Sequence, residues 1–319
     1  MLTYILFAVG FILLIKGADL LVDGAASIAK KFNISDLVIG LTVVAFGTSA
    51  PELAVNLISS FKGNTDLAIG NIVGSNIANI LLILGVAAII YPLKVKITTV
   101  WKEIPFSLLG ALILFVMASD VLLDGATFSA LTRTDGLTLI GFFGIFLYYT
   151  FGISKNTDTL ETDDITIRST AASLAMVAGG LVGLVLGGQW IVDGAVKMAT
   201  VLGMSQSVIG LTVVAIGTSL PELATTISAS LKKRSDMAIG GIVGSNIFNI
   251  FWILGVSSII RPLPVGVSNY VDLTISIIAS ALLFVFLFVG KRHILERWQG
   301  WCFLALYFSY TGYLVFAVR

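Results

Sequence analysis

The sequence VIGLTVVAFGTSAPELA at residues 38–54 occurs again, almost unchanged, as VIGLTVVAIGTSLPELA at residues 208–224. Each copy places one glutamate, Glu52 or Glu222, inside a segment that is otherwise apolar enough to lie in a bilayer. An ionisable side chain is expensive to place there, so such a residue marks a functional site by default. We therefore take these two acids as the centre of the functional hypothesis.

A second shared stretch follows each copy. It reads GNIVGSNIANI at residues 70–80 and GGIVGSNIFNI at residues 240–250. Aligned without a gap, residues 38–92 and 208–262 are identical at 36 of 55 positions. The chain therefore contains an internal repeat, and any site in one copy is expected to have a counterpart in the other.

Composition indicates a membrane protein. Of 319 residues, 57% are hydrophobic and 12% are charged, and the mean hydropathy is +1.02. Soluble domains carry about twice that charged fraction. Apolar runs of about 20 residues recur along the chain, which is the length a helix needs to cross a bilayer. We predict an all-α polytopic membrane protein that contacts the lipid bilayer.

Several classes of protein are excluded by what the sequence lacks. The net charge is +1 and no basic stripe is present, so no nucleic-acid partner is expected. The only cysteine, Cys302, excludes an intrachain disulfide, and the only histidine, His293, excludes histidine-based zinc sites. Neither a phosphate-binding loop nor an activated nucleophile is present, so we expect no enzyme activity and no cofactor. Protein partners are not indicated.

Run lengths, charges and Gly/Pro clusters predict ten transmembrane helices. Their expected ranges are 3–30, 37–61, 66–90, 101–119, 134–152, 170–199, 207–231, 237–260, 267–290 and 298–317.

The only long polar connection divides these helices into two sets of five. We expect a first five-helix repeat at 1–153, a cytoplasmic linker at 154–168 and a second repeat at 169–319. Because five is odd, the second repeat enters the membrane from the opposite side, and the two repeats are inverted. Inverted repeats bring corresponding segments together near the midplane. Glu52 and Glu222 are expected to meet there.

The distribution of basic residues predicts the orientation. The odd-numbered loops hold 13 Lys and Arg residues, whereas the opposite side holds five. Positive residues favour the cytoplasmic side. We therefore expect a multi-pass protein of the cell (plasma or inner) membrane with both termini outside the cytoplasm.

The Gly-Thr-Ser-x-Pro-Glu motif has a physical reading. Proline donates no backbone hydrogen bond and clashes with the carbonyl four residues earlier, so Pro51 and Pro221 should break their helices near Gly47 and Gly217. Backbone carbonyls freed inside a membrane are tolerated only beside an ion, water or another partner. The break is therefore expected to line a polar site.

Oxygen-bearing side chains surround both breaks. Thr48 stands four residues before Glu52, as Thr218 does before Glu222, so each pair shares a helix face. The second shared stretch adds Ser75, Asn79, Ser245 and Asn249. Carboxylate, amide and hydroxyl oxygens are hard ligands that suit Ca²⁺ and Na⁺ and disfavour Zn²⁺ or Cu⁺.

Electrostatics indicates that such a site exchanges its occupants. Two carboxylates ~5 Å apart repel by roughly 3 kcal/mol at an effective dielectric of about 20, and each also loses hydration. The pair should therefore always hold a divalent cation, monovalent cations or protons, and one kind of ion leaves only when another replaces its charge.

The doubled G-T-S-x-P-E and G-S-N-I-x-N-I segments resemble the two α-repeats of the calcium/cation antiporter superfamily, in its prokaryotic sodium/calcium exchanger branch. The resemblance implies a ten-helix fold with a central cation site, in which the first and sixth helices slide against the remainder. It implies the following ligands, with Ala45 and Ala215 contributing backbone carbonyls: Thr48, Ser49, Glu52, Ser75, Asn79, Thr218, Ser219, Glu222, Ser245 and Asn249.

One position departs from some relatives, which carry aspartate where this chain has Asn249. The core then holds only two carboxylates, which weakens a potassium-dependent reading. We expect a secondary-active antiporter that exchanges Ca²⁺ for Na⁺ by alternating access. The alternatives are an H⁺-coupled or broader divalent-cation exchanger and, in a different class, a cation channel.

Simpler readings remain open for individual residues. The glutamates could form structural ion pairs, the two asparagines could join helices by hydrogen bonds, and the hydroxyls could bond helix carbonyls. Lys16 and Asp19 are close enough on the first helix to pair. Gly179, Gly180 and Gly187 make the sixth helix smooth, which would allow either sliding or tight packing.

Overall fold

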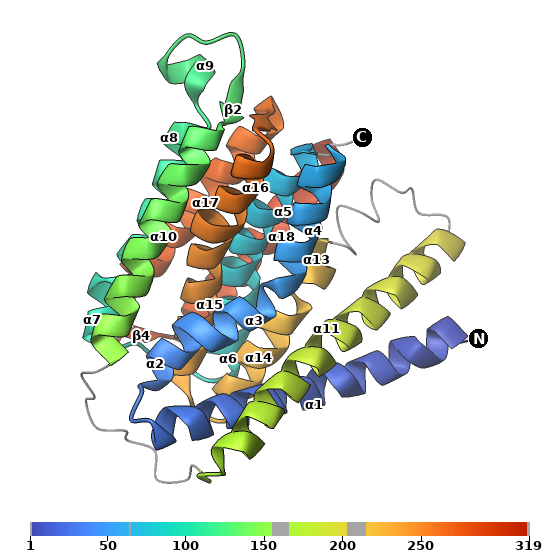
Figure 1. Cartoon of the computed structure of the whole chain (residues 1–319), viewed down its shortest axis with the longest axis vertical. Coiled ribbons are helices and arrows are strands. Elements are labelled where there is room, and N and C mark those ends of the chain that lie inside the picture. Colours follow the sequence, from blue (N-terminus) through green and yellow to red (C-terminus); the bar gives the residue numbers. More distant parts are fainter. Residues whose placement is uncertain (1, 64, 155–165, 203–214, 318–319) are drawn as a thin grey trace.

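The computed structural model describes residues 2–63, 65–154, 166–202 and 215–317, and nearly all of them are helical (Figure 1). The first half contains α1 (Leu2–Lys31), α2 (Asp36–Ile39), η1 (Gly40–Val44), α3 (Ala45–Thr48), α4 (Ala50–Lys62), α5 (Thr65–Ile77), η2 (Ala78–Leu84), α6 (Gly85–Ile90), β1 (Leu93–Lys94), α7 (Ile97–Trp101), α8 (Glu103–Met117), α9 (Asp120–Leu123), β2 (Ser129–Leu131) and α10 (Arg133–Ser154). The second half contains α11 (Thr170–Val201), α13 (Ala215–Thr218), α14 (Leu220–Leu231), α15 (Ser235–Ile247), η4 (Phe248–Leu254), α16 (Gly255–Ile260), β3 (Leu263–Val265), α17 (Val267–Phe286), β4 (Ile294–Leu295) and α18 (Arg297–Ala317).

Seven helices are long and apolar enough to cross a membrane, and an eighth is obtained if the bent pair α2–α3 and α4 counts as one span. Within the described part of the chain, α13–α14 and α18 are not among them. The first residues of the segment predicted at 207–231 lie outside the described residues. Most of the predicted linker lies outside them as well. The fold is therefore a helical membrane bundle, with fewer spans by length and composition than the ten that were predicted.

Two continuous helices form the centre of the bundle. In an apolar 18-residue stretch of α5–η2–α6, 78% of the residues are buried, and in the matching stretch of α15–η4–α16, 89% are buried. Apolar residues occur on every face of both helices, which is the pattern of a buried helix. In each, a π-helical stretch, η2 or η4, interrupts the α-helix after Ile77 or Ile247. Such wide turns are often found at functional sites.

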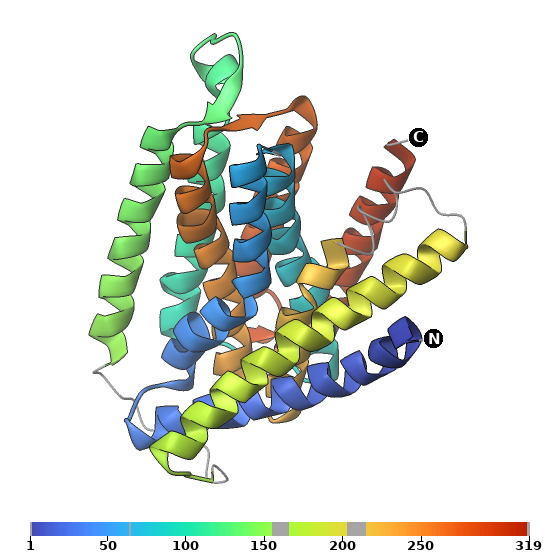
Figure 2. The same cartoon turned by 45° about the vertical axis from the view of Figure 1, so that its right-hand side comes forward.

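Helices α1 and α11 lie side by side along most of their length and cross the other helices obliquely (Figures 1 and 2). Glycines make this contact close. A Cβ on Gly180 would lie 2.7 Å from the Gly17 carbonyl oxygen, and one on Gly187 would lie 2.7 Å from that of Gly10. A Cβ on Gly179 would meet nothing within 4 Å. Gly180 and Gly187 therefore pack α11 tightly against α1. On this face of α11, tight packing is favoured over sliding.

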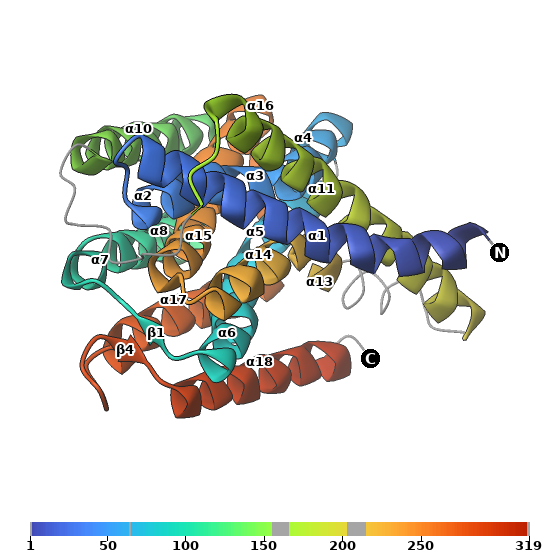
Figure 3. The same cartoon turned by 90° about the horizontal axis from the view of Figure 1, so that it is seen from below.

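The remaining helices surround the centre. Helix α17 packs on α8, α10 packs on α16 and η4, and α18 packs on α6 at the edge of the molecule seen at the bottom of Figure 3. Two short antiparallel ladders, which the sequence did not predict, tie loops together: β1 pairs with β4, and β2 with β3. Strands of two or three residues carry too short a pattern to recognise in a sequence.

Candidate functional site

Both Gly-Thr-Ser-x-Pro-Glu motifs break their helices as their prolines predict. Helix α3 ends at Thr48 and α4 begins at Ala50, with a bend of 46° between the two pieces. Ser49 and Ser219 occupy the equivalent junctions, with φ/ψ of −80°/7° and −88°/6°. Each proline lies in the first turn of the new helix, where its missing N–H costs nothing. The break therefore exposes two helix ends without a lost hydrogen bond at proline.

The two glutamates lie in the first turns of α4 and α14 and are buried, with side chains 0% and 1% exposed. The positive end of a helix dipole favours a carboxylate at this position. Other buried residues of the predicted set are Thr48, Ser49, Ser75, Asn79, Ser219, Ser245 and Asn249, and Thr218 is partly exposed. Burial of so many polar side chains in one place requires partners for them.

Hydrogen bonds join the two halves of the chain at this point. Ser49 Oγ donates to Glu222 Oε1 at 3.1 Å, so a residue of α3–α4 contacts the acid of α14. Ser75 Oγ lies 3.3 Å from Glu52 Oε1, to which it donates, and 3.4 Å from Ser219 Oγ. The structure thus brings together the two acids that the sequence placed 170 residues apart.

Four oxygens of this cluster are buried and have no hydrogen-bond partner among the described residues. They are one oxygen from each of the four side chains that the sequence placed at the centre of the site: Glu52 Oε2, Glu222 Oε2, Asn79 Oδ1 and Asn249 Oδ1. Each unsatisfied buried acceptor costs about 1–3 kcal/mol, and more when it is charged. All four are acceptors, so the group that satisfies them must be a cation or a donor.

No group of three or more His, Cys, Asp or Glu side chains that could hold a metal occurs among the described residues. The cluster instead combines two carboxylates with neutral oxygens. This composition suits hard cations that accept amide and hydroxyl oxygens, and it offers neither sulfur nor imidazole.

The hydroxyls and backbone carbonyls of the predicted set are used in several ways. Thr48 Oγ1 lies 3.4 Å from the Ala45 carbonyl oxygen, to which it donates, and 3.5 Å from Ser245 Oγ. The same carbonyl accepts the Ser49 N–H at 3.0 Å, so it is not freed by the helix break. Ala215 begins α13, and its side chain lies outside the described residues.

Two asparagines of the site were not among the residues predicted from the sequence. Asn76 and Asn246 are both 2% exposed and hydrogen-bond the predicted residues Asn249 and Asn79. The signal was present, because both occupy the same aligned position of the shared G-S-N-I stretch. Spacing from Glu52 alone did not identify them.

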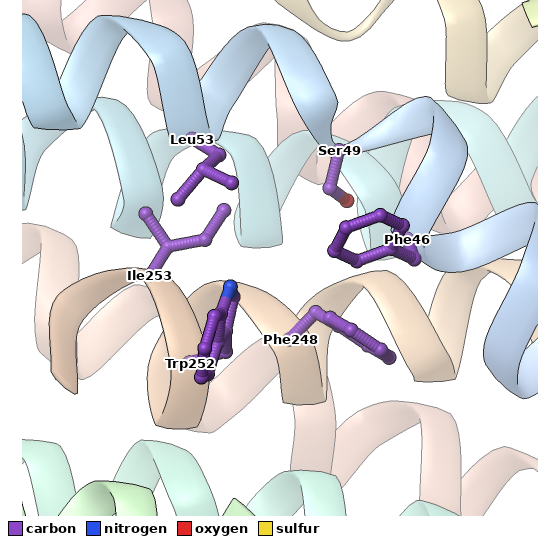
Figure 4. A pocket seen from close by; sticks show the side chains of 6 residues that line it. All are labelled: Phe46, Ser49, Leu53, Phe248, Trp252 and Ile253. Carbon is purple, nitrogen blue, oxygen red and sulfur yellow. The ribbon is translucent and has the colours of Figure 1, made fainter. Parts of the chain in front are cut away.

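A small pocket adjoins the cluster at Ser49 (Figure 4). Phe46, Ser49 and Leu53 line one side, and the side chains on η4 that face them are Phe248, Trp252 and Ile253. Ser49 is the only hydroxyl among these lining residues and is also the donor to Glu222. The pocket therefore reaches the polar cluster through an otherwise apolar wall.

Asp19 and Asp23 of α1 contact α14 and Lys232, the residue that follows it. Lys232 Nζ lies 2.8 Å from Asp23 Oδ1 and 3.3 Å from Asp19 Oδ1. Ser228 Oγ donates to the same oxygen of Asp19 at 2.7 Å. The predicted Lys16–Asp19 pair is therefore replaced by an ion pair between helices, because Lys232 reaches both acids at once.

Comparison with known proteins identifies relatives over nearly the whole chain. A family model described as "Sodium/calcium exchanger protein" matches residues 2–152 and 172–316. The sodium/calcium exchanger MaX1 of Methanosarcina acetivorans is 32% identical, and the match covers 98% of this chain and 97% of that protein. The inner membrane protein YrbG of Escherichia coli is 39% identical, with 81% of this chain and 79% of that protein covered.

Solved structures agree. The sodium-calcium exchanger NCX_Mj, soaked with 2.5 mM Na⁺ and 10 mM Sr²⁺, superposes with a TM-score of 0.83 at 37% identity, covering 96% of this chain and 97% of that one.

Proposed function

The chain belongs to the sodium/calcium exchanger family, and from this premise we propose that it exchanges Ca²⁺ for Na⁺ across the cell membrane as a secondary-active antiporter. In this proposal, Ca²⁺ and Na⁺ are the transported ions and compete for one binding site. The single observation that carries the proposal is the set of four buried acceptor oxygens, two from each half of the chain, that have no hydrogen-bond partner in the part of the chain that the structure describes.

The proposed site lies where the breaks of α3–α4 and α13–α14 meet the central helices. Its ligands are the carboxylates and amides with unpartnered oxygens, together with hydroxyls and carbonyls of the following residues: Ala45, Thr48, Ser49, Ser75, Ala215, Thr218, Ser219 and Ser245. Two ionised carboxylates buried in one cluster are unfavourable unless a cation or protons neutralise them. Release of one ion therefore requires replacement by another, which is the condition for exchange rather than leak.

The ten-span topology with two inverted repeats, 1–153 and 169–319, is part of this proposal. Contacts cannot cross a bilayer, so each contact between loops requires both loops to lie on one side. The β1–β4 ladder and the Lys96–Asp236 ion pair of 3.1 Å join loops that the topology places in the cytoplasm. The β2–β3 ladder joins loops that it places outside. These contacts support the grouping of the loops into two sides, and the excess of basic residues in the first group is the argument for assigning it to the cytoplasm.

Alternating access is supported by the polar faces of the two site helices. Both helices bury polar side chains on the C-terminal side of their glutamates. On α4 these are Asn56, Ser59 and Ser60. On α14 they are Thr225, Thr226, Ser228 and Ser230. In the proposed topology these faces run from the site to opposite sides of the membrane. We propose that the closely packed pair α1 and α11 moves as one body and opens one face at a time.

The test is Ca²⁺ uptake into proteoliposomes that contain the purified protein. We expect an outward Na⁺ gradient to drive Ca²⁺ accumulation and an imposed pH gradient of equal size to drive much less. Accumulation driven equally well by the pH gradient would replace Na⁺ with H⁺ as the counter-ion. Ca²⁺ entry that follows its own gradient without a counter-ion would identify a channel and would overturn the proposal.

A further inference from the structure

Asn76 and Asn246 determine how two ligand side chains of the site are turned. We propose that they are positioning residues, each of which holds the amide nitrogen of an asparagine in the opposite half so that the amide oxygen faces the ion. The inference rests on the proposed cation site and adds to it the residues that orient its neutral ligands.

The orientation of Asn76 follows from a backbone atom. Its Nδ2 donates to the carbonyl oxygen of Asn246 at 3.3 Å, and a carbonyl oxygen only accepts. The other end of the Asn76 amide, Oδ1, therefore faces Asn249, whose Nδ2 donates to it at 2.9 Å. Asn249 must present its nitrogen in this direction, because two amide oxygens would repel.

Both donors of Asn249 are used on this side. Its Nδ2 lies 3.3 Å from Ser75 Oγ as well as 2.9 Å from Asn76 Oδ1. Its Oδ1 is buried and has no partner among the described residues. An amide nitrogen carries two donors, so the nitrogen is satisfied and the free end is an acceptor.

The other half repeats the contact between the two asparagines. Asn79 Nδ2 donates to Asn246 Oδ1 at 2.9 Å, and Asn79 Oδ1 is again buried with no partner among the residues that the structure describes. The pairing is crossed: Asn76 acts on Asn249, and Asn246 acts on Asn79, although 76 and 79 are close in the sequence. Each half of the chain thus orients a ligand that belongs to the other half.

Orientation matters for asparagine and not for aspartate. Rotation of an amide by 180° exchanges an acceptor for a positively polarised NH₂ group, which a cation repels. A carboxylate has an oxygen at both ends, so the same rotation leaves an acceptor in place. A site with two asparagine ligands and no aspartate, as proposed for this chain, therefore depends on residues that fix the amides. Removal of partners that orient ligands typically lowers metal affinity by about 10–100-fold.

A double-mutant cycle tests the mechanism. Calorimetry gives the Kd for Ca²⁺, and proteoliposome flux gives the half-saturating Ca²⁺ concentration. For Asn76→Leu, which keeps the shape and removes the acceptor, we expect about a 10–100-fold loss of Ca²⁺ affinity. In the Asn249→Asp background, Asn76→Leu should lower the Ca²⁺ affinity by less than about three-fold, because a carboxylate presents an oxygen in either orientation. Asn76→Ser, which is too short to reach residue 249, serves if the leucine variant does not fold.

The matched control uses the crossed pairing. Asn246→Leu should remain damaging in the Asn249→Asp background and should be rescued by Asn79→Asp instead. An equal loss from Asn76→Leu in both backgrounds, or wild-type affinity in Asn76→Leu, would overturn the positioning role while the exchanger assignment stands. A wild-type protein that neither binds nor transports Ca²⁺ would overturn both.

Discussion

The central helices and the α1–α11 pair are built on opposite principles. In apolar 18-residue stretches of the two central spans, 78% and 89% of the residues are buried, whereas in those of α1 and α11 only 33% are buried. In the centre, polar side chains are held by hydrogen bonds between the two halves. At the α1–α11 contact, backbone meets backbone through glycines. The candidate site therefore lies where side chains cannot rearrange cheaply, and the proposed moving body lies where few side chains interlock with the rest.

The strongest test of the central region removes one of its charges. We expect Glu222→Gln, and equally Glu52→Gln, to reduce Na⁺-dependent Ca²⁺ uptake at least about 100-fold, because a site with one carboxylate cannot match a divalent cation. Thermal unfolding in detergent should show a folded protein, since glutamine keeps the shape and removes a buried charge.

The control for this prediction is another buried acid. Glu103 lies on α8, is 1% exposed and accepts a hydrogen bond from the Tyr149 hydroxyl, outside the site. Glu103→Gln keeps an acceptor for Tyr149 and should leave Ca²⁺ uptake close to the wild-type rate. If uptake persists in both site variants, the central cluster is not the cation site.

The α1–α11 contact can be tested with adjacent glycines. A Cβ on Gly180 would meet the Gly17 carbonyl oxygen and the Leu21 nitrogen, each at 2.7 Å, whereas one on Gly179 would meet nothing. We expect Gly180→Ala to lower the free energy of unfolding by about 1–3 kcal/mol, because neither backbone atom can withdraw. Gly179→Ala should be neutral or stabilise by up to about 1 kcal/mol through helix propensity. Equal thermal midpoints for the two variants would contradict the close glycine contact.

The smallest expected effect concerns the ion pairs that fasten α1 to α14. The aligned residues in the other half, Lys62 and Asp193, are exposed and form no ion pair with any described residue, in contrast to Lys232 and Asp23. We expect Lys232→Gln to cost at most about 1 kcal/mol, because the pair is partly exposed to solvent. The distribution of distances between spin labels on α1 and α14 should become broader in this variant. In Lys62→Gln the same distribution should match that of the wild-type protein. A broader distribution in Lys62→Gln would contradict the difference between the two halves.

Much of the site was predictable because its signals are local. A glutamate within an apolar run, a proline four residues after glycine and a doubled motif are each readable in a short window, and they identified Glu52, Glu222 and the helix breaks. The resemblance to sodium/calcium exchangers, read from the same motifs, is confirmed by the family match. Helix α11, predicted at 170–199, spans Thr170–Val201, since a long apolar run with a serine cap before it defines both ends.

The misses are contacts whose partners lie far away along the chain. Lys16, three residues away, is the partner that the sequence suggests for Asp19, whereas its ion pair in the structure is with Lys232 from the other half. Asn76 was passed over because its partners, Asn249 and the Asn246 carbonyl, come from the other half. The π-helical stretches η2 and η4 shift the register of their helices at Asn79 and Asn249, and a regular 3.6-residue pattern cannot anticipate such a shift.

The sequence by itself determined that this protein is a helical membrane protein with a duplicated, acid-centred motif, because hydropathy, proline and the cost of burying a charge act within single segments. Three features were decided only by the tertiary structure. They are the buried oxygens that have no partner among the described residues, the asparagine pairs that hydrogen-bond between the halves, and the glycines through which α1 and α11 are in contact. Those choices depend on how helices from the two halves cross, and the geometry of a crossing is set by packing over the whole bundle.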